Sequence, residues 1–320
     1  MTQLPAALDE AGRPRGYPKD RTFRATDGAR IAYTMVGEGD RTPVVLVPGL
    51  CCTDTYVAPL VPGLNDAGHP VLIIDNRGHF DSGLPRRPGL GARRLRRGDV
   101  SPTRMGRDVI EMLDDAGVER AAVAGHSLGV QILFEAYRVG RADRVAALVP
   151  IAGTYENPVS TFADRDLNHL FNIFEVIRPW LPFEALGWLV SRIQSPKLGA
   201  ALVQKVGAGG ANITAELMQP HVDRIKDANF AVMFRVISEM RDHSAADLLE
   251  DLDVPLLVCA GGADTFTPPS IQKRMVELAP NAELALWDDA THFLPVDKTD
   301  EVVERIHTFL AERVGSQTNV

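Results

Sequence analysis

Short apolar runs alternate along this chain with longer stretches whose apolar residues recur at helical spacing. Val44 to Val47, Pro70 to Asp75 and Ala121 to Ala124 are dominated by aliphatic residues, which is typical of strands buried on both faces of a parallel sheet. The alternation predicts an α/β chain whose mainly parallel sheet is covered by helices on both faces. The other predicted strands are an opening hairpin of Thr22 to Thr26 and Arg30 to Val36, followed by Val145 to Ile151, Pro255 to Ala260 and Ala282 to Trp287. Two helices are predicted, one over Val130 to Val139 and one that ends at about Ala116. The second begins with Ser101 as N-cap and Pro102 in its first position.

The strand pattern disappears between Gly153 and about Ala246, where the sequence reads as helical. A helical cap needs an apolar face to dock on a core, so each of its aromatic residues is expected first to pack inside it or against the core. Aromatic residues that face inward would instead make the pocket apolar. The expected organisation is an N-terminal extension at 1–20, an α/β core at 21–153 and 247–314, an inserted helical cap at 154–246 and a tail at 315–320, with Phe162, Phe171, Phe174, Trp180 and Phe234 as candidate pocket residues.

A candidate nucleophile lies in the pattern G-x-S-x-G of residues 125–129, between an apolar run and a helical stretch. Glycines two residues to either side of Ser127 permit a sharp strand-to-helix turn that side chains there would block. Such a turn would lift the Ser127 hydroxyl to the carboxyl edge of the sheet, beside the N-terminus of a helix. Taken alone, this pentapeptide fits a glycine-rich turn without chemistry equally well, so the assignment depends on its partners.

A serine hydroxyl needs a base, and the base needs an acid to orient it. Asp264 and His292 each follow one of the two last predicted strands, so we expect Asp264 to be the acid and His292 the base, in the chain order Ser, Asp, His. Asp288 and Asp289 are closer to His292 in sequence. They precede it on the same loop, however, whereas an orienting acid has to approach Nδ1 from a neighbouring strand end.

Taken together, these motifs resemble the α/β-hydrolase fold of the serine esterase and lipase type over residues 21–314. Residues 48–50 (Pro-Gly-Leu) stand where that family has its His-Gly oxyanion loop, with Pro48 in place of histidine. Residues 75–82 resemble its Asp-x-Arg-Gly-x-Gly-x-Ser loop, with Phe80 where glycine is usual. Each match is weak alone, whereas the ordered set is specific.

The resemblance implies a hydrolase that cleaves a carboxylic ester with a hydrophobic portion through an acyl-enzyme on Ser127, with lactones and thioesters as close variants. The backbone N–H groups of Leu50 and Leu128 would bind the oxyanion, and neither a metal nor an organic cofactor is expected. A serine at the turn argues against epoxide hydrolase chemistry, for which this family uses aspartate there. The alternatives left open are carbon–carbon bond hydrolysis, acyl transfer, aminopeptidase action, cofactor-free perhydrolysis and a non-catalytic small-molecule receptor.

Two further features carry hypotheses about the substrate. An arginine loop, defined here as residues 86–97, contains Arg86, Arg87, Arg93, Arg94, Arg96 and Arg97. It fits a solvated surface loop better than a patch that recruits acidic substrates or a partner. His126 is expected to be structural, and contact of His79 with the substrate is a weaker hypothesis.

Composition limits the remaining classes. A chain of 320 residues with 45% hydrophobic content can bury a large core, and a net charge of −8 gives no support for nucleic-acid binding. Three cysteines cannot all pair, which favours a reducing compartment. The N-terminus lacks an apolar segment, and charges and prolines interrupt the most apolar long window, residues 170–193. We therefore expect a cytoplasmic protein without membrane insertion that acts on a small-molecule substrate.

Overall fold

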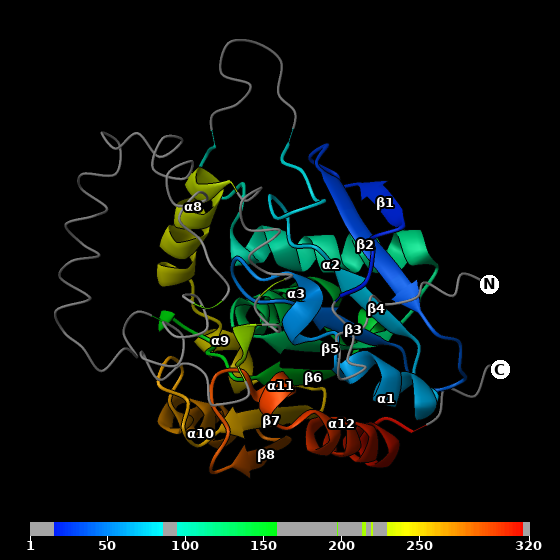
Figure 1. Cartoon of the computed structure of the whole chain (residues 1–320), viewed down its shortest axis with the longest axis vertical. Helices are drawn as coiled ribbons and strands as arrows, with labels where there is room; N and C mark the ends of the chain where they lie inside the picture. Colours follow the sequence, from blue (N-terminus) through cyan, green and yellow to red (C-terminus); the bar gives the residue numbers. More distant parts are fainter. Residues whose placement is uncertain are drawn as a thin grey trace, which may run out of the picture.

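The computed structural model describes residues 16–85, 95–158 and 229–315, with isolated positions at 197, 213–215 and 219. The strands within these residues are β1 (Arg21–Arg24), β2 (Arg30–Val36), β3 (Val44–Val47), β4 (Val71–Ile74), β5 (Ala121–His126), β6 (Val145–Ile151), β7 (Leu256–Gly261) and β8 (Ala282–Trp287). They form one sheet in the order β1-β2-β4-β3-β5-β6-β7-β8 (Figure 1). β1 pairs antiparallel with β2 and β2 antiparallel with β4, while the later pairs are parallel. The mainly parallel sheet that the sequence predicts is confirmed.

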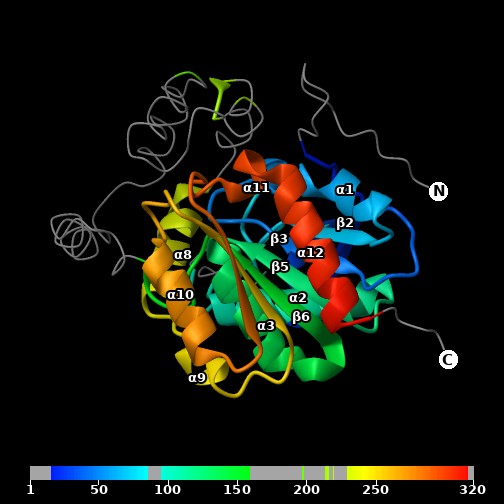
Figure 2. The same ribbon diagram turned by 90° about the horizontal axis from the view of Figure 1, so that it is seen from below.

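Helices cover both faces of this sheet (Figures 1 and 2). One face packs against α1 (Leu60–Asp66) and α12 (Thr299–Arg313). The opposite face packs against α2 (Pro102–Ala116), α3 (Leu128–Arg144) and α10 (Pro269–Leu278). The remaining described helices are α8 (Phe230–Arg241), α9 (Ala246–Leu249), α11 (Leu294–Asp297) and the 3-10 helix η1 (Asp54–Tyr56).

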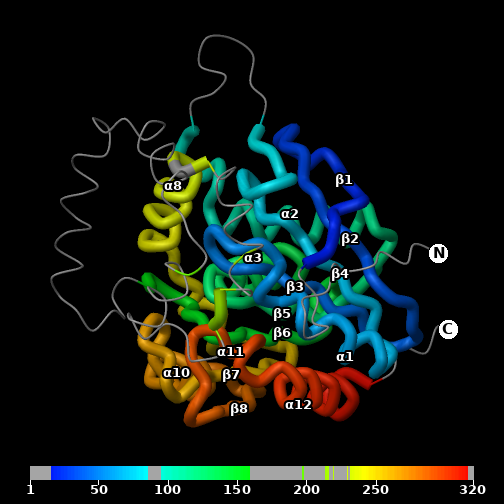
Figure 3. Tube along the Cα trace, in the orientation of Figure 1, coloured from blue at the N-terminus to red at the C-terminus, as the bar shows by residue number. Residues whose placement is uncertain are grey.

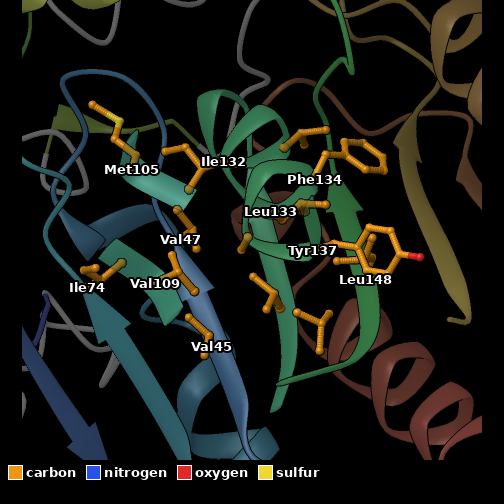
Figure 4. Close-up of a cluster of buried hydrophobic side chains, with 14 of the residues drawn as sticks. Val45, Val47, Ile74, Met105, Val109, Ile132, Leu133, Phe134, Tyr137 and Leu148 are labelled. Carbon is orange, nitrogen blue, oxygen red and sulfur yellow. The ribbon is translucent and has the colours of Figure 1, made fainter. Parts of the chain in front are cut away.

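The side chains of β5 show how one strand serves two cores. Val123 belongs to the cluster beneath α2 and α3, whereas Ala122 and Ala124 belong to the cluster beneath α1 and α12, because successive side chains of a strand point to opposite faces. Figure 4 shows the first cluster, in which strand side chains meet α2 and α3. Its labelled members are Val45, Val47, Ile74, Met105, Val109, Ile132, Leu133, Phe134, Tyr137 and Leu148.

The start of α2 follows the predicted capping signal. The Ser101 side chain accepts a hydrogen bond from the N–H of Arg104, and Pro102 is the first helical residue. Such a cap contributes about 1 kcal/mol to stability.

By contrast, the sequence carries no helical signal for α1, which contains Pro62 and Gly63. The proline is accommodated because it lies in the first turn of the helix, where its missing N–H costs no hydrogen bond.

The expected cap, residues 154–246, falls mostly outside the described residues, so its boundaries stay a prediction. Its last part forms α8, a helix that begins with a side-chain cap from Asn229 to the N–H of Val232. Ile213 is fully buried and packs with Tyr56 and Phe293 of the core.

The expected N-terminal extension, residues 1–20, has its last residues in contact with the core. It includes Lys19, whose ammonium group lies 2.8 Å from Asp54.

Candidate functional site

Ser127 makes the whole turn between β5 and α3. Its backbone has φ 57° and ψ −114°, a conformation that a residue with a side chain rarely adopts. A Cβ atom added to Gly125 would lie 2.2 Å from the carbonyl oxygen of Gly129, and one added to Gly129 would lie 2.3 Å from that of Val47. Both positions therefore require glycine, as the pentapeptide predicts. Because one residue completes the turn, β5 extends to His126 and α3 begins at Leu128, closer together than the apolar pattern indicates.

The structure brings the three predicted side chains together. The hydroxyl oxygen of Ser127 lies 3.1 Å from Nε2 of His292, and Nδ1 of His292 lies 3.0 Å from Oδ2 of Asp264. These distances fit the tautomer in which Nδ1 donates to Asp264 and Nε2 accepts from Ser127. The three residues follow β5, β7 and β8, so parallel strands deliver them to one edge of the sheet.

Asp264 is held as a carboxylate by its own loop. It is 3% exposed; its Oδ1 accepts from the N–H groups of Phe266 and Thr267, and its Oδ2 accepts from the Thr267 hydroxyl at 2.7 Å. Burial favours a higher pKa, but the neighbouring His292 and these hydrogen bonds outweigh burial and lower the pKa of Asp264 below its usual value. Thr267 was not among the predicted site residues, although a threonine three residues after an aspartate could have indicated this turn.

The ring nitrogens of His292 contact Asp264 and Ser127, and not the two rival carboxylates. Asp288 and Asp289 are exposed, and Asp289 lies 2.8 Å from the ammonium group of Lys298. The loop of His292 is instead anchored by Asp297, which accepts a hydrogen bond from the N–H of Thr291 at 2.9 Å. Asp297 belongs to α11 and carried no sequence signal.

Two further histidines are buried, and one of them contacts the His292 loop. Nε2 of His126 lies 2.8 Å from the carbonyl oxygen of His292, and the His126 side chain is buried, which agrees with the structural role expected for it. His79 is also buried, and its Nδ1 lies 3.1 Å from the carbonyl oxygen of Arg77. Contact of His79 with a substrate stays a hypothesis.

Because of these two histidines, we expect the folded protein to lose stability at acidic pH. Burial lowers the pKa of His79 to about 4, and burial together with the nearby His292 lowers that of His126 to about 4. Each folded-state pKa lies below the unfolded value near 6.5, so the stabilising contribution is complete above about pH 6.5 and is lost as the pH falls towards 4. We expect the free energy of unfolding to fall by up to about 3 kcal/mol for each histidine over this range.

Urea unfolding between pH 7 and pH 4 measures this loss. His79→Phe removes one of the two titrating groups and should flatten the pH profile of the free energy of unfolding by about half. An equally steep profile in His79→Phe would show that His79 does not contribute to acid unfolding.

The predicted oxyanion groups lie at the start of α3 and in the loop after β3. The N–H of Leu128 is the first of α3, so the helix supplies no carbonyl partner for it. Leu50 belongs to the loop after β3, the strand that pairs with β5. A Cβ atom added to Gly49 would lie 3.1 Å from Cβ of Ser127, which shows how closely this loop approaches the serine.

Phe80 occupies the position where the resembled loop has glycine, and its φ is 42°. This value lies in the left-handed region that favours glycine, which explains the usual residue. Phe80 adopts it at a cost of about 1 to 2 kcal/mol.

Two aromatic rings lie next to the His292 ring in the described part of the chain. The ring of Phe266 lies 5.3 Å from it and that of Phe293 lies 6.1 Å from it, and Phe293 in turn packs 4.8 Å from Tyr56. Of the candidate pocket residues, Phe234 is half-buried on α8. The others, Phe162, Phe171, Phe174 and Trp180, lie outside the described residues, and their place in a pocket stays a prediction.

Most of the arginine loop also lies outside the described residues. Within it, Arg97 lies 2.9 Å from Asp242, and both side chains are largely exposed. Exposed ion pairs of this kind contribute at most about 1 kcal/mol. Arg97 therefore takes part in a weak ion pair at the surface.

The described residues contain neither a metal-binding cluster nor a helix that could span a membrane. No group of three or more His, Cys, Asp or Glu side chains there is arranged to hold a metal ion. Among the helices of residues 16–85, 95–158 and 229–315, none combines the length and apolar character needed to cross a bilayer.

Comparison with known proteins gives consistent matches. The model of the Alpha/beta hydrolase family matches residues 44–305. Epoxide hydrolase A of Mycobacterium tuberculosis is 25% identical over 328 residues, covering 92% of this chain and 98% of that protein. A thermophilic esterase from Thermogutta terrifontis has a TM-score of 0.68 at 20% identity, covering 91% of this chain and 98% of its own. A meta-cleavage product hydrolase from Pseudomonas fluorescens has a TM-score of 0.68 at 17% identity, covering 92% and 98%. At these identities the structural matches establish the fold.

Proposed function

This chain belongs to the Alpha/beta hydrolase family and is a hydrolase, and from that premise we propose that it cleaves carboxylic esters through an acyl-enzyme on Ser127. The observation that carries the proposal is the chain of two contacts from Ser127 through His292 to Asp264, at 3.1 and 3.0 Å. A serine hydroxyl is a weak nucleophile at neutral pH, and this arrangement is the one that activates it.

The reaction follows from these positions. His292 Nε2 accepts the hydroxyl proton as Ser127 Oγ forms a bond to the ester carbonyl carbon, whose oxygen becomes negatively charged. The N–H groups of Leu50 and Leu128 bind this oxyanion. When the carbon–oxygen bond to the alcohol breaks, His292 returns the proton to the leaving alkoxide and an acyl-enzyme remains. A water molecule then attacks the acyl carbon while His292 accepts its proton. The proton passes to Ser127 as the carboxylic acid leaves.

Asp264 supports each step without changing its own charge. Its pKa is held below the usual value by His292 and Thr267, so it stays ionised when His292 becomes protonated. A carboxylate at Nδ1 stabilises the imidazolium and keeps the tautomer in which Nε2 can accept a proton.

The substrate we propose is a small ester with a hydrophobic portion. Beside His292 the described residues form an apolar cluster of Tyr56, Ile213 and Phe293, with Cys52 and Phe266 packed against it, and we propose that this cluster forms one wall of the substrate site. Such a wall stabilises bound apolar groups by removing their surface from water. The exposed pair of Arg97 and Asp242 supports the solvated reading of the arginine loop.

The similarity to Epoxide hydrolase A raises epoxide opening as a rival activity. The side chain at the turn of this chain is the Ser127 hydroxyl, not a carboxylate. We therefore propose ester hydrolysis and expect no turnover of an epoxide such as styrene oxide.

A series of p-nitrophenyl esters from acetate to decanoate tests this proposal. Burying each added methylene contributes about 0.8 kcal/mol of favourable free energy. We therefore expect kcat/KM to rise by up to about four-fold per methylene until the pocket is full. Ser127→Ala, assayed in parallel, gives the background rate.

An anionic ester measured at low and high salt tests the competing role of the arginine loop, because salt screens attraction between exposed charges. A flat or falling chain-length profile, together with strong salt sensitivity for the anionic ester, would replace the apolar pocket with electrostatic recruitment. Turnover of styrene oxide without turnover of any ester would reject ester hydrolysis itself.

A further inference from the structure

The loop that carries Leu50 receives a buried hydrogen bond from a neighbouring strand end. Nδ2 of Asn76 donates to the carbonyl oxygen of Pro48 at 2.9 Å, and Asn76 is 4% exposed. We propose that Asn76 is a positioning residue that holds the oxyanion loop, residues 48–50, in place beside Ser127. The inference rests on the proposed serine hydrolase function, for which it identifies a residue that acts through the loop and not on the substrate.

The oxyanion loop is weakly supported by its own backbone. Proline has no N–H, so Pro48 cannot be anchored through its nitrogen. The turn that follows closes with a long contact of 3.4 Å from the N–H of Cys52 to the carbonyl oxygen of Gly49, and Cys51 has a φ of 55°. A loop with these features needs a partner from outside to keep one conformation.

The order of the strands provides that partner. β3 lies between β4 and β5 (Figure 3), with Leu46 in register with Ile73 on one side and with Ala124 on the other. Asn76, Pro48 and Ser127 thus follow three adjacent parallel strands and meet at one edge. The bond from Asn76 fixes the peptide between Pro48 and Gly49, which sets the direction of the next N–H groups.

The backbone of Asn76 is itself held in place. The N–H of Asp75 donates to the carbonyl oxygen of Ala32 at 2.9 Å, and the N–H of His79 donates to the carbonyl oxygen of Asn76 at 2.9 Å. Main-chain bonds on both sides therefore hold the Asn76 backbone. The side-chain amide is presented to Pro48 by a turn that does not depend on the substrate.

The carbonyl oxygen of Pro48 depends on the Asn76 amide. Without the Asn76 donor, the Pro48 carbonyl would lose the one side-chain hydrogen bond described for it. A buried carbonyl without its partner is costly, so the loop would rotate to recover one.

Two variants remove the donor in different ways. Asn76→Ala deletes the amide, and Asn76→Asp keeps its shape but presents a carboxylate that cannot donate. In both we expect kcat for a p-nitrophenyl ester to fall about 10- to 100-fold with KM within about three-fold, because a displaced donor acts on the transition state. The inhibition constant of a trifluoromethyl ketone, which forms a tetrahedral adduct on serine, should rise by the same factor as kcat/KM falls.

Ser82→Ala is the matched control. The Ser82 hydroxyl accepts from the N–H of Ala32 and donates to the carbonyl oxygen of Asp75, so the variant loses two buried bonds of the same turn but none to Pro48. Its Tm should fall as much as that of Asn76→Ala, while kcat stays within about three-fold of the wild-type value.

The outcomes separate this inference from the proposed function. A wild-type enzyme that turns over the esters, with folded Asn76 variants whose kcat and ketone inhibition constants are unchanged, would reject the role of Asn76 alone. An equal loss of kcat in Ser82→Ala would reduce that role to general stability of the turn. A wild-type protein that neither cleaves the esters nor reacts with a fluorophosphonate at Ser127 would reject both. If Asn76→Ala does not fold, the same comparisons are decided by Asn76→Asp.

Discussion

Ser127→Ala is expected to lower kcat for ester hydrolysis by about 10⁴-fold or more, because without the hydroxyl no acyl-enzyme can form. KM should change little, since the apolar wall around His292 is untouched. A fluorophosphonate probe should label the wild-type protein and leave the alanine variant unlabelled. Equal labelling of both proteins would mean that the nucleophile is another residue.

The backbone of Ser127 allows a second variant to serve as control. Glycine tolerates a φ of 57° and a ψ of −114° far better than serine. We expect Ser127→Gly to be as inactive as the alanine variant and to raise the free energy of unfolding by about 1 to 2 kcal/mol. A lower free energy of unfolding in Ser127→Gly would show that the turn stores no strain.

Asp264→Asn is expected to reduce kcat by a similar factor, about 10⁴-fold, with the fold intact. The amide would place an N–H donor opposite Nδ1 of His292 and so favour the wrong tautomer, in which Nε2 carries the proton and cannot accept one from Ser127. Circular dichroism and urea unfolding would show that the loss is chemical and not structural.

Asp288→Asn and Asp289→Asn are the matched controls for this substitution. Both carboxylates are exposed, and Asp289 pairs with Lys298. Each variant should keep kcat within about three-fold of the wild-type value, as expected for exposed groups. If either were the severe variant, the contact between Asp264 and His292 would not operate in catalysis.

The three central residues of the site could be read from the sequence because the relevant signals are local. Ser127, Asp264 and His292 each stand just past an apolar run, and parallel strands deliver their carboxyl ends to one edge. The requirement for Gly125 and Gly129 is also local, since it arises within one turn. Boundaries were less exact: β1 ends at Arg24, two residues before the predicted end, because a turn closed by the N–H of Ala25 and the carbonyl oxygen of Ala29 begins there.

The residues that support the site could not be read in the same way. Asp297 anchors the His292 loop, and Asn76 binds Pro48 across 28 positions of sequence. Neither pairing leaves a periodic pattern or a motif, and α1 was missed because Pro62 and Gly63 hide its helical character. Local propensity is overridden there by packing against α12.

The amino-acid sequence by itself determined the α/β class, the sheet with helices on both faces, and the order in which Ser127, Asp264 and His292 arrive, because apolar periodicity and turn chemistry act over a few residues. Only the tertiary structure decided which loops touch. The order β4-β3-β5 places Asn76 and Ser127 on either side of the oxyanion loop, and the pairing of β7 with β8 places Asp264 within 3.0 Å of His292. Strand order and register arise from the packing of the whole core, so contacts between distant loops follow from the complete fold and from no single segment of the chain.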